Sequence, residues 1–316
     1  MSLLSLLIAL MAEKTLSSSI WRFDFYYQKY ISFFQNNGVL SRIKATSIRY
    51  TLFLLVPVVI IYGVLAIVDN GLLHLIISTL ILIVTLGCSK TRNSYKQYLL
   101  AAFKGDDTTS NLHHQQLLED KNLPAVGFGQ ALIWLNYRYY IAIMIFFIFF
   151  GAAGAVFYRL LTTVIEQENG CTLNKKTENE TAEIKNNEVQ EVVEETTDSS
   201  IESSFDEGIK NEPVLSCNNY HKILFYIDWL PVRITSFGYM FVGHFSKAFP
   251  MWLESLFDTK KLTHEVLIDV AQKSEDIMLE DGDCTAEPCL LVRLAKRNLL
   301  LMLALIALLT LIGIVS

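Results

Sequence analysis

Residues 223–245 read ILFYIDWLPVRITSFGYMFVGHF, and this stretch decides how we expect the chain to fold. It is apolar enough to enter a bilayer, yet it carries Asp228, Arg233 and His244. A charged side chain at membrane depth costs roughly 3 kcal/mol and normally faces the interior of a helix bundle or a water-filled cavity. We therefore expect membrane helices packed around Asp228 and Arg233, and a functional site where these two side chains lie.

The rest of the chain supports a membrane protein. Apolar residues make up 52% of the sequence. Four windows without Asp, Glu, Lys or Arg are about long enough to cross a bilayer, at residues 50–68, 72–87, 139–158 and 299–316. The third contains the small residues Gly151 to Ala155, which permit close helix approach. The sequence therefore predicts an all-α fold, a polytopic membrane helical bundle with cytoplasmic helical loops. No basic stripe with interleaved aromatic residues is present, which argues against nucleic acid as a partner.

The order of these segments divides the chain into four parts. Residues 1–49 hold an apolar run and an interfacial amphipathic helix, and residues 50–165 hold membrane helices with a cytoplasmic helical loop at 88–138. Residues 166–218 form an acidic loop, in which residues 166–212 include 14 acidic and 4 basic side chains, and we expect it to be disordered. Residues 219–316 hold the 223–245 stretch, a cytoplasmic segment and a C-terminal membrane helix.

The positive-inside rule sets the orientation of the spans. Basic residues stand directly before the first window, at Arg42, Lys44 and Arg49, which places the N-terminus in the cytoplasm. A single crossing by residues 139–158 would then leave the basic residues before the last window on the periplasmic side, at Arg293, Lys296 and Arg297. A crossing by residues 223–245 removes this conflict, and we expect it; a re-entrant dip is the alternative.

Two groups of polar residues are candidates for binding an anion. Asn136 and Arg138 lie where the cytoplasmic loop meets the third window, and the planar guanidinium of an arginine suits a phosphate or carboxylate. An interface anchor is the simpler interpretation of this pair. Asp228 and Arg233 either join Asn136 and Arg138 in one ligand pocket at the cytoplasmic membrane face, or Asp228 pairs with Arg233 or Arg138 only to hold the bundle together. His244 follows Arg233 by about three helical turns, or roughly 16 Å, and would lie at the opposite end of a row of polar side chains on the same helix face.

A third group lies in the cytoplasmic loop. Asp106 and Asp107 are followed by His113 and His114, and carboxylates with imidazoles suggest a divalent cation. We name Asp106 as the candidate metal ligand and Mg²⁺ as the only candidate cofactor. A solvated loop is the alternative, and the sequence shows no glycine-rich phosphate loop or dinucleotide fingerprint.

Three motifs carry a resemblance to a known family. They are QALIWLNYRYY at 130–140, YIDWLPVR at 226–233, and the Gly243-His244 pair followed by Lys247-Ala248 and Pro250-Met251-Trp252. With these motifs the sequence resembles the AmpE family of inner-membrane proteins linked to the regulation of β-lactamase expression. It is more distantly similar to the adenosylcobinamide-phosphate synthases. Their Arg-Asp-Thr motif corresponds here to Lys104-Gly105-Asp106, so only Asp106 carries over.

The resemblance implies a multi-pass protein of the bacterial inner membrane that modulates β-lactamase induction in response to cell-wall status. The implied ligand is an anionic small molecule or a muropeptide-type fragment, and a membrane protein partner fits the same role beside the bilayer. The alternative is a membrane-embedded synthase or transferase that acts on a phosphate-bearing substrate. Whether the protein is an enzyme stays open at this stage.

Overall fold

A computed structural model of the whole chain describes residues 2–16, 18–36, 46–188, 217–258, 260–275 and 285–313. Within these ranges all regular elements are helices and no strand occurs, which confirms the predicted all-α class. In chain order the elements are α1 (Ser2–Thr15), η1 (Ser19–Trp21), α2 (Phe23–Asn36), α3 (Thr46–Ile67), α4 (Gly71–Thr85), α5 (Ser89–Ala102), α6 (Asp107–Lys121), α7 (Phe128–Asn136), η2 (Tyr137–Ile141), α8 (Ala142–Glu188), α9 (Cys217–Val242), α10 (Phe245–Phe257), α11 (Thr263–Ser274) and α12 (Ala286–Leu311).

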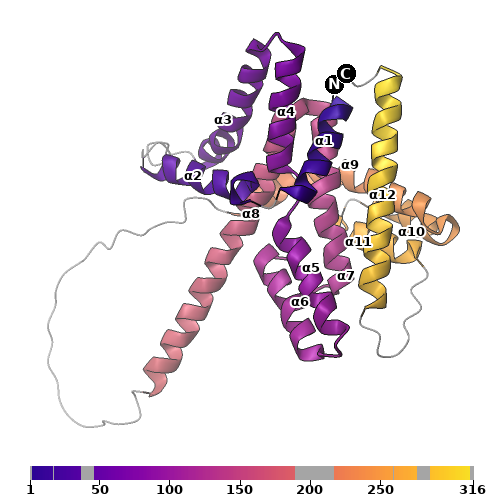
Figure 1. Cartoon of the computed structure of the whole chain (residues 1–316). Coiled ribbons are helices and arrows are strands. Elements are labelled where there is room, and N and C mark those ends of the chain that lie inside the picture. The colour runs from indigo at the N-terminus through magenta and orange to yellow at the C-terminus, as the bar shows by residue number, and fades with distance from the viewer. Residues whose placement is uncertain are drawn as a thin grey trace.

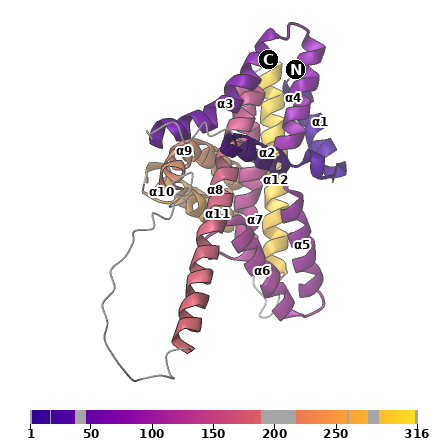
Figure 2. The same ribbon diagram turned by 90° about the vertical axis from the view of Figure 1, so that its left-hand side faces the viewer.

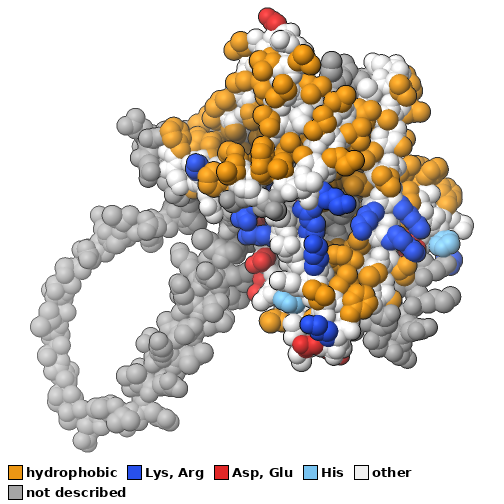
Figure 3. Space-filling model, viewed as in Figure 1, with side chains coloured by type: hydrophobic (Ala, Val, Ile, Leu, Met, Phe, Trp, Pro, Cys, Tyr) orange, Lys and Arg blue, Asp and Glu red, His pale blue; other side chains and the backbone are white. Residues whose placement is uncertain are grey.

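The helices form an apolar part and a polar part. Helices α1, α3 and α4 and the end of α12 lie at the top of Figures 1 and 2, while α5, α6 and the start of α12 lie below them. Figure 3 shows hydrophobic side chains over the upper part and a band of Lys and Arg at its lower edge. Because a membrane protein exposes apolar side chains to lipid and basic ones at the cytoplasmic interface, the band marks the membrane edge.

By length and apolarity, two runs in the described residues could cross a membrane, namely Phe128–Gln167 and α12. A third is possible if α4 and α5, which meet at a bend of 41°, count as one span. Residues Thr51–Ile67 of α3 form a shorter apolar helix. Helix α9 is not among them, so length and apolarity alone give two or three candidate spans, where the sequence suggested five.

The run Phe128–Gln167 is not straight, because it reverses direction at Gly151. This glycine has φ 66° and ψ −160°, and the chain is helical on both sides of it. The rings of Phe146 and Tyr158 stack with centroids 4.9 Å apart, and Arg138 Nη1 lies 4.0 Å from Glu166 Oε1. In a straight helix, residues 138 and 166 would be about 42 Å apart. We call residues 137–166 the Gly151 hairpin, since both of its arms begin and end at the same level.

Two glycines make this hairpin possible. The dihedral angles of Gly151 fall in a region that is essentially restricted to glycine. A Cβ on Gly154 would lie 2.6 Å from the carbonyl oxygen of Phe146 on the opposite arm, so a glycine is needed there for the arms to pack closely. The small residues at 151–155, expected to serve helix packing, therefore also make the turn.

The hairpin corrects the expected topology. A single crossing by residues 139–158 is wrong, because Arg159 Cζ lies only 4.3 Å from the ring centroid of Tyr139. With both arms returning to one side, the basic residues before α12 already lie on the same side as Arg138, so a crossing by residues 223–245 is no longer needed to explain them. The sequence argument failed because it treated every apolar window of spanning length as straight.

The acidic loop is described only in part. Helix α8 continues to Glu188, so the start of the segment expected to be disordered is helical. Its Glu, Lys and Ala residues favour a helix once the membrane arm has nucleated one. The remainder, residues 189–216, lies outside the described residues.

This topology predicts the labelling of two exposed positions. In a cysteine-free background, Gln167→Cys is expected to resist a membrane-impermeant maleimide applied to the periplasmic face of spheroplasts, because both hairpin arms return to the cytoplasm. The control Asp69→Cys, between α3 and α4, is expected to be labelled. Labelling of Gln167→Cys as fast as that of the control would mean that residues 139–158 cross the membrane after all.

Candidate functional site

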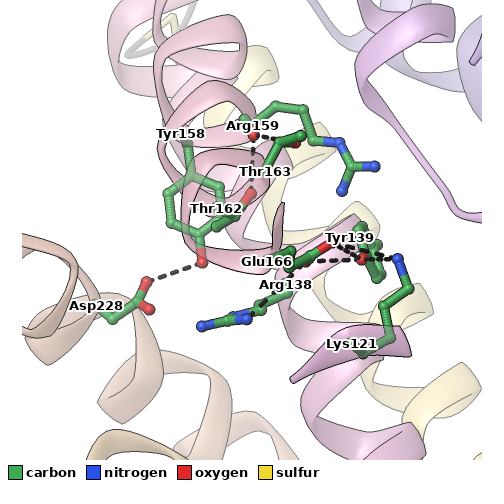
Figure 4. Close-up of polar contacts among 9 residues, drawn as sticks. All are labelled: Lys121, Arg138, Tyr139, Tyr158, Arg159, Thr162, Thr163, Glu166 and Asp228. Carbon is green, nitrogen blue, oxygen red and sulfur yellow. Dashed lines mark hydrogen bonds and ion pairs between the residues drawn. The ribbon is translucent and has the colours of Figure 1, made fainter. Parts of the chain in front are cut away.

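Charged and phenolic side chains fill the space where the two arms of the Gly151 hairpin meet α6 and α9. Figure 4 shows Lys121 at the end of α6, Arg138 and Tyr139 on η2, Arg159 and Glu166 on α8, and Asp228 on α9. Arg138, Arg159 and Asp228 are 7%, 4% and 0% exposed. Burying this much charge is unfavourable unless the groups pair, so their contacts decide what the site can do.

Local structure brings these side chains together. η2 is a single π-helical turn, and such turns are frequent at functional sites. Helix α6 ends immediately after Lys121, because Asn122 adopts a left-handed conformation with φ 47°. That ending leaves the Lys121 ammonium beside Tyr139, to whose hydroxyl it donates a hydrogen bond of 2.5 Å.

Glu166 is the hub of the first group, which we call the Glu166 cluster (Lys121, Arg138, Tyr139, Arg159 and Glu166). Tyr139 Oη donates to the carboxylate at 2.8 Å, and Lys121 Nζ donates to Oε2 at 3.3 Å. Burial disfavours the charged form of Lys121, but Tyr139 and Glu166 outweigh it and hold the lysine pKa above its usual value. The cluster therefore favours the charged form of Lys121.

Arg159 belongs to the same cluster but makes no ion pair with a carboxylate in the described part of the chain. Its guanidinium lies over the ring of Tyr139 and 5.6 Å from the ring centroid of Phe23. Its Nε and Nη1 atoms are buried without a hydrogen-bond partner in the described structure. Two threonines, Thr162 and Thr163, donate to its backbone carbonyl at 2.9 and 2.8 Å, which satisfies the backbone but not the side chain.

Asp228 forms a second group with two tyrosines of the hairpin. Tyr137 Oη and Tyr158 Oη both donate to Asp228 Oδ1, at 2.7 and 2.9 Å. Its second oxygen, Oδ2, has no hydrogen-bond partner in the part of the chain that is described. In Figure 4 the Arg138 guanidinium extends towards Asp228 from the Glu166 side, so Arg138 lies between the two groups.

The structure brings two of the sequence-predicted site residues together, Arg138 and Asp228. Arg138 stacks on Trp134 with its Cζ 5.1 Å from the ring centroid and faces Asp228 on α9, while Asn136 lies two residues before Arg138 at the end of α7. Asn136 Oδ1 and Arg138 Nε are buried without hydrogen-bond partners among the described residues, as is Asp228 Oδ2. Each of the three residues thus retains one polar atom that a ligand or a bound water could satisfy.

Arg233 has a different role from the predicted anion clamp. Its guanidinium donates to four backbone carbonyls, those of Trp229, Ser255, Leu256 and Asp258, at 2.7 to 3.2 Å. Three of these carbonyls belong to the C-terminal end of α10, where helix carbonyls lack intrahelical partners. Arg233 therefore caps α10 and ties it to α9, and its donors are not free to share an anion with Arg138.

His244 lies at the junction between α9 and α10. Its backbone N–H donates to the carbonyl of Ser274 at the end of α11, at 2.7 Å. Sixteen residues separate it from Asp228, which corresponds to about 24 Å along a helix. The structure therefore does not bring His244 to the same site as Asp228.

Asp106 caps the N-terminus of α6. Its carboxylate accepts hydrogen bonds from Thr109 N at 3.0 Å, from Thr108 Oγ1 at 2.7 Å and from Thr109 Oγ1 at 2.6 Å. The side-chain and backbone bonds from Thr109, with the bond from Thr108, lower the Asp106 pKa to about 2. Among the described residues no three metal-ligating side chains of the His, Cys, Asp and Glu types come together. The geometry therefore gives no support to the Mg²⁺ hypothesis, which stays a prediction.

Sequence reasoning missed the centre of the site. Glu166 was assigned to the acidic loop and Lys121 to the cytoplasmic helical loop at 88–138, because only the reversal at Gly151 brings them to Tyr139. One signal was available in the sequence. Arg159 directly follows an uncharged window of 20 residues at 139–158, and a charge so close to an apolar run calls for an inward-facing partner.

The fold and this site define a helical membrane protein that buries a charged network at the membrane edge. The family described as "Regulatory signalling modulator protein AmpE" matches residues 1–184 and 215–316, and the chain belongs to this family. It is 26% identical over 248 residues to Protein AmpE of Shigella flexneri, covering 76% of this chain and 74% of that protein. No solved structure matches.

The family match omits residues 185–214, which lie in the acidic loop. The likeness to the adenosylcobinamide-phosphate synthases is not shown by these comparisons.

Proposed function

We propose that the protein is an inner-membrane regulator that modulates β-lactamase induction in response to cell-wall status. The observation that carries this proposal is the family match, which covers both halves of the chain and all elements of the site. The site itself suggests how a regulator would work. Asp228 on α9 and Lys121 on α6 both contact the Gly151 hairpin, so a change at one group alters the packing of elements on both sides of the membrane edge.

The orphaned polar atoms support a ligand at the Asp228 side of the hairpin. Arg138 Nε is an unused donor, while Asn136 Oδ1 and Asp228 Oδ2 are unused acceptors. A carboxylate would bond to the arginine and amide N–H groups would bond to the two oxygens. Peptide fragments of the cell wall carry both groups, so a muropeptide-type ligand could bond to all three atoms. A simple phosphate offers acceptors and would bond only to the arginine. A partner protein in the membrane would receive the resulting change in packing.

The test is Arg138→Lys in a strain that lacks the chromosomal copy of the gene and carries an inducible β-lactamase reporter. Lysine keeps the positive charge but loses the planar fork and the stack on Trp134. We expect a normal protein level in the membrane fraction. The regulatory effect, measured as the difference in reporter activity between strains with and without this protein, is expected to fall tenfold or more.

The matched control is Arg293→Lys, because Arg293 is exposed on α12. It is expected to behave as the unaltered protein. A normal regulatory response from Arg138→Lys at a normal protein level would remove Arg138 from the mechanism.

A further inference from the structure

Two adjoining cavities lie beside the Glu166 cluster, and Lys121, Glu166 and Arg159 of that cluster border them. One cavity of about 190 Å³ is bordered by residues of α2, α6 and α8, and a smaller one of about 40 Å³ lies against the junction of α4 and α5. The two share Arg22, Asp24 and Lys90, so they adjoin. We call them together the basic cavity. None of the family motifs at 130–140 or 226–233 contributes to it.

Outside two ion pairs, the charged residues that border the basic cavity are more often basic than acidic. Two ion pairs are internal to it, Arg92 with Glu13 at 2.7 Å and Lys121 with Glu166 at 3.3 Å. The remaining basic residues that border it are Arg22, Lys90 and Arg159, and the remaining acidic ones are Asp24 and Asp120. The net charge of these five groups is positive, which favours an anion.

Arg159 supplies the unsatisfied donors that an anion requires. It is 4% exposed, borders the smaller cavity, and its Nε and Nη1 atoms have no hydrogen-bond partner in the described structure. No carboxylate among the described residues lies within ion-pair distance of it. The carboxylates of Glu166 and Asp24 lie near Arg159, but neither bonds to these two nitrogen atoms, and a phosphate oxygen would satisfy them.

Helix α5 adds backbone donors at the same place. It begins at Ser89, its N-cap residue Cys88 makes no side-chain capping bond, and both residues border the smaller cavity. The first N–H groups of a helix lack intrahelical partners and, together with the helix dipole, favour a negative charge. The bend at Gly87, with φ 78°, turns α5 away from α4 and opens its N-terminus to the cavity.

An apolar groove of about 390 Å³ adjoins the basic cavity on the membrane side. It runs between α2, α3, α4 and α8, and its lining includes Tyr27, Pro57, Ile81 and Leu160. Phe23 and Val84 border both the groove and the smaller basic cavity, so the two are continuous. The groove has the right polarity for an acyl chain, and the cavity has the right charge for a headgroup.

We propose that this composite site binds one anionic phospholipid, with its phosphate at Arg159 and the start of α5 and its acyl chain in the groove of α2, α3, α4 and α8. Arg22 and Lys90, both exposed at the rim, face the outer part of the headgroup. A soluble phosphate ester would use the cavity but leave the groove empty, which is why the continuity of the two favours a lipid. The proposal does not depend on the regulatory function of the protein.

Delipidated full-length protein in dodecyl maltoside provides the test, with thermal unfolding measured against added lipid. Phosphatidylglycerol is expected to raise the unfolding midpoint by several degrees, because a ligand that binds only the folded state stabilises it. Phosphatidylcholine, which is net neutral, and glycerol 3-phosphate, which has no acyl chain, are expected to raise it much less. Because both side chains attract the anionic headgroup, Arg22→Gln with Lys90→Gln should raise the half-maximal lipid concentration tenfold or more.

The matched control is Lys96→Gln with Lys104→Gln, which removes the same charge from exposed positions on and just after α5. It is expected to keep the wild-type lipid response. Equal stabilisation by phosphatidylglycerol and phosphatidylcholine, or equal loss of response in the two double variants, would overturn the site. Equal stabilisation by glycerol 3-phosphate would replace the lipid with a soluble anion and overturn the lipid assignment. Arg159→Gln serves as a third variant, expected to abolish the response if it folds.

Discussion

Glu166→Gln is expected to cost about 3 to 5 kcal/mol of stability, the range for removing one partner of a buried ion pair. The Glu166 side chain is 9% exposed and that of Lys121 is 8% exposed, so solvent cannot replace the lost charge. The amide keeps a hydrogen bond with Tyr139 but leaves the charges of Lys121 and Arg138 without their carboxylate. The hairpin base is then expected to loosen, and the amount of folded protein to fall.

Thermal unfolding in detergent and protein level in the membrane fraction measure this effect. Glu254→Gln, at an exposed position on α10, is the control and should change neither. Adding Lys121→Gln to Glu166→Gln should recover part of the loss, because replacing both partners of a buried pair is far less costly than stranding one. A loss of less than about 1 kcal/mol for the single variant would mean that the cluster does not hold the hairpin together.

Gly151→Ala is expected to destabilise the protein by about 1 to 3 kcal/mol through backbone strain alone. A Cβ at this position would meet no atom within 4 Å, so steric overlap with neighbours is not the cause. The cause is the φ of 66° with ψ −160°, which an alanine rarely adopts. If the turn straightens instead, Arg138 and Glu166 separate and the cluster is lost as well.

Gly63→Ala provides a matched comparison. Gly63 lies inside α3, also has no atom within 4 Å of its ideal Cβ position, and has no positive φ. An alanine there is expected to be neutral or to stabilise by up to about 1 kcal/mol, because it reduces the entropy lost on forming a helix. Equal unfolding midpoints for the two variants would show that Gly151 does not impose the turn.

Local chemistry made several features of this protein predictable. The clean apolar windows indicated helices, the windows at 50–68 and 72–87 correspond to the separate helices α3 and α4, and three motifs indicated the AmpE family. The cost of burying charge pointed to Arg138 and Asp228, which do lie on facing elements. These features depend only on residue type and near neighbours, so a sequence carries them directly.

Arg233 shows where such reasoning stops. Its position in an apolar stretch correctly predicted an inward-facing side chain, with 3% exposure. What it contacts depends on where α10 ends, some 22 to 25 residues further along the chain. Burial could therefore be predicted, but a capping role could not be told apart from an anion clamp.

Residue types and their spacing were enough to indicate that the chain is helical, apolar enough for a membrane, related to AmpE, and obliged to turn its few intramembrane charges inward. The hairpin of residues 137–166 became visible only in the folded molecule, because composition does not reveal whether an apolar run of spanning length is straight or reversed. That one reversal at Gly151 brings Glu166 back to Arg138 and Tyr139 and leaves Arg159 facing the basic cavity. The site exists because two helical arms, each about two-thirds the length of a crossing, bring distant charges to the same depth.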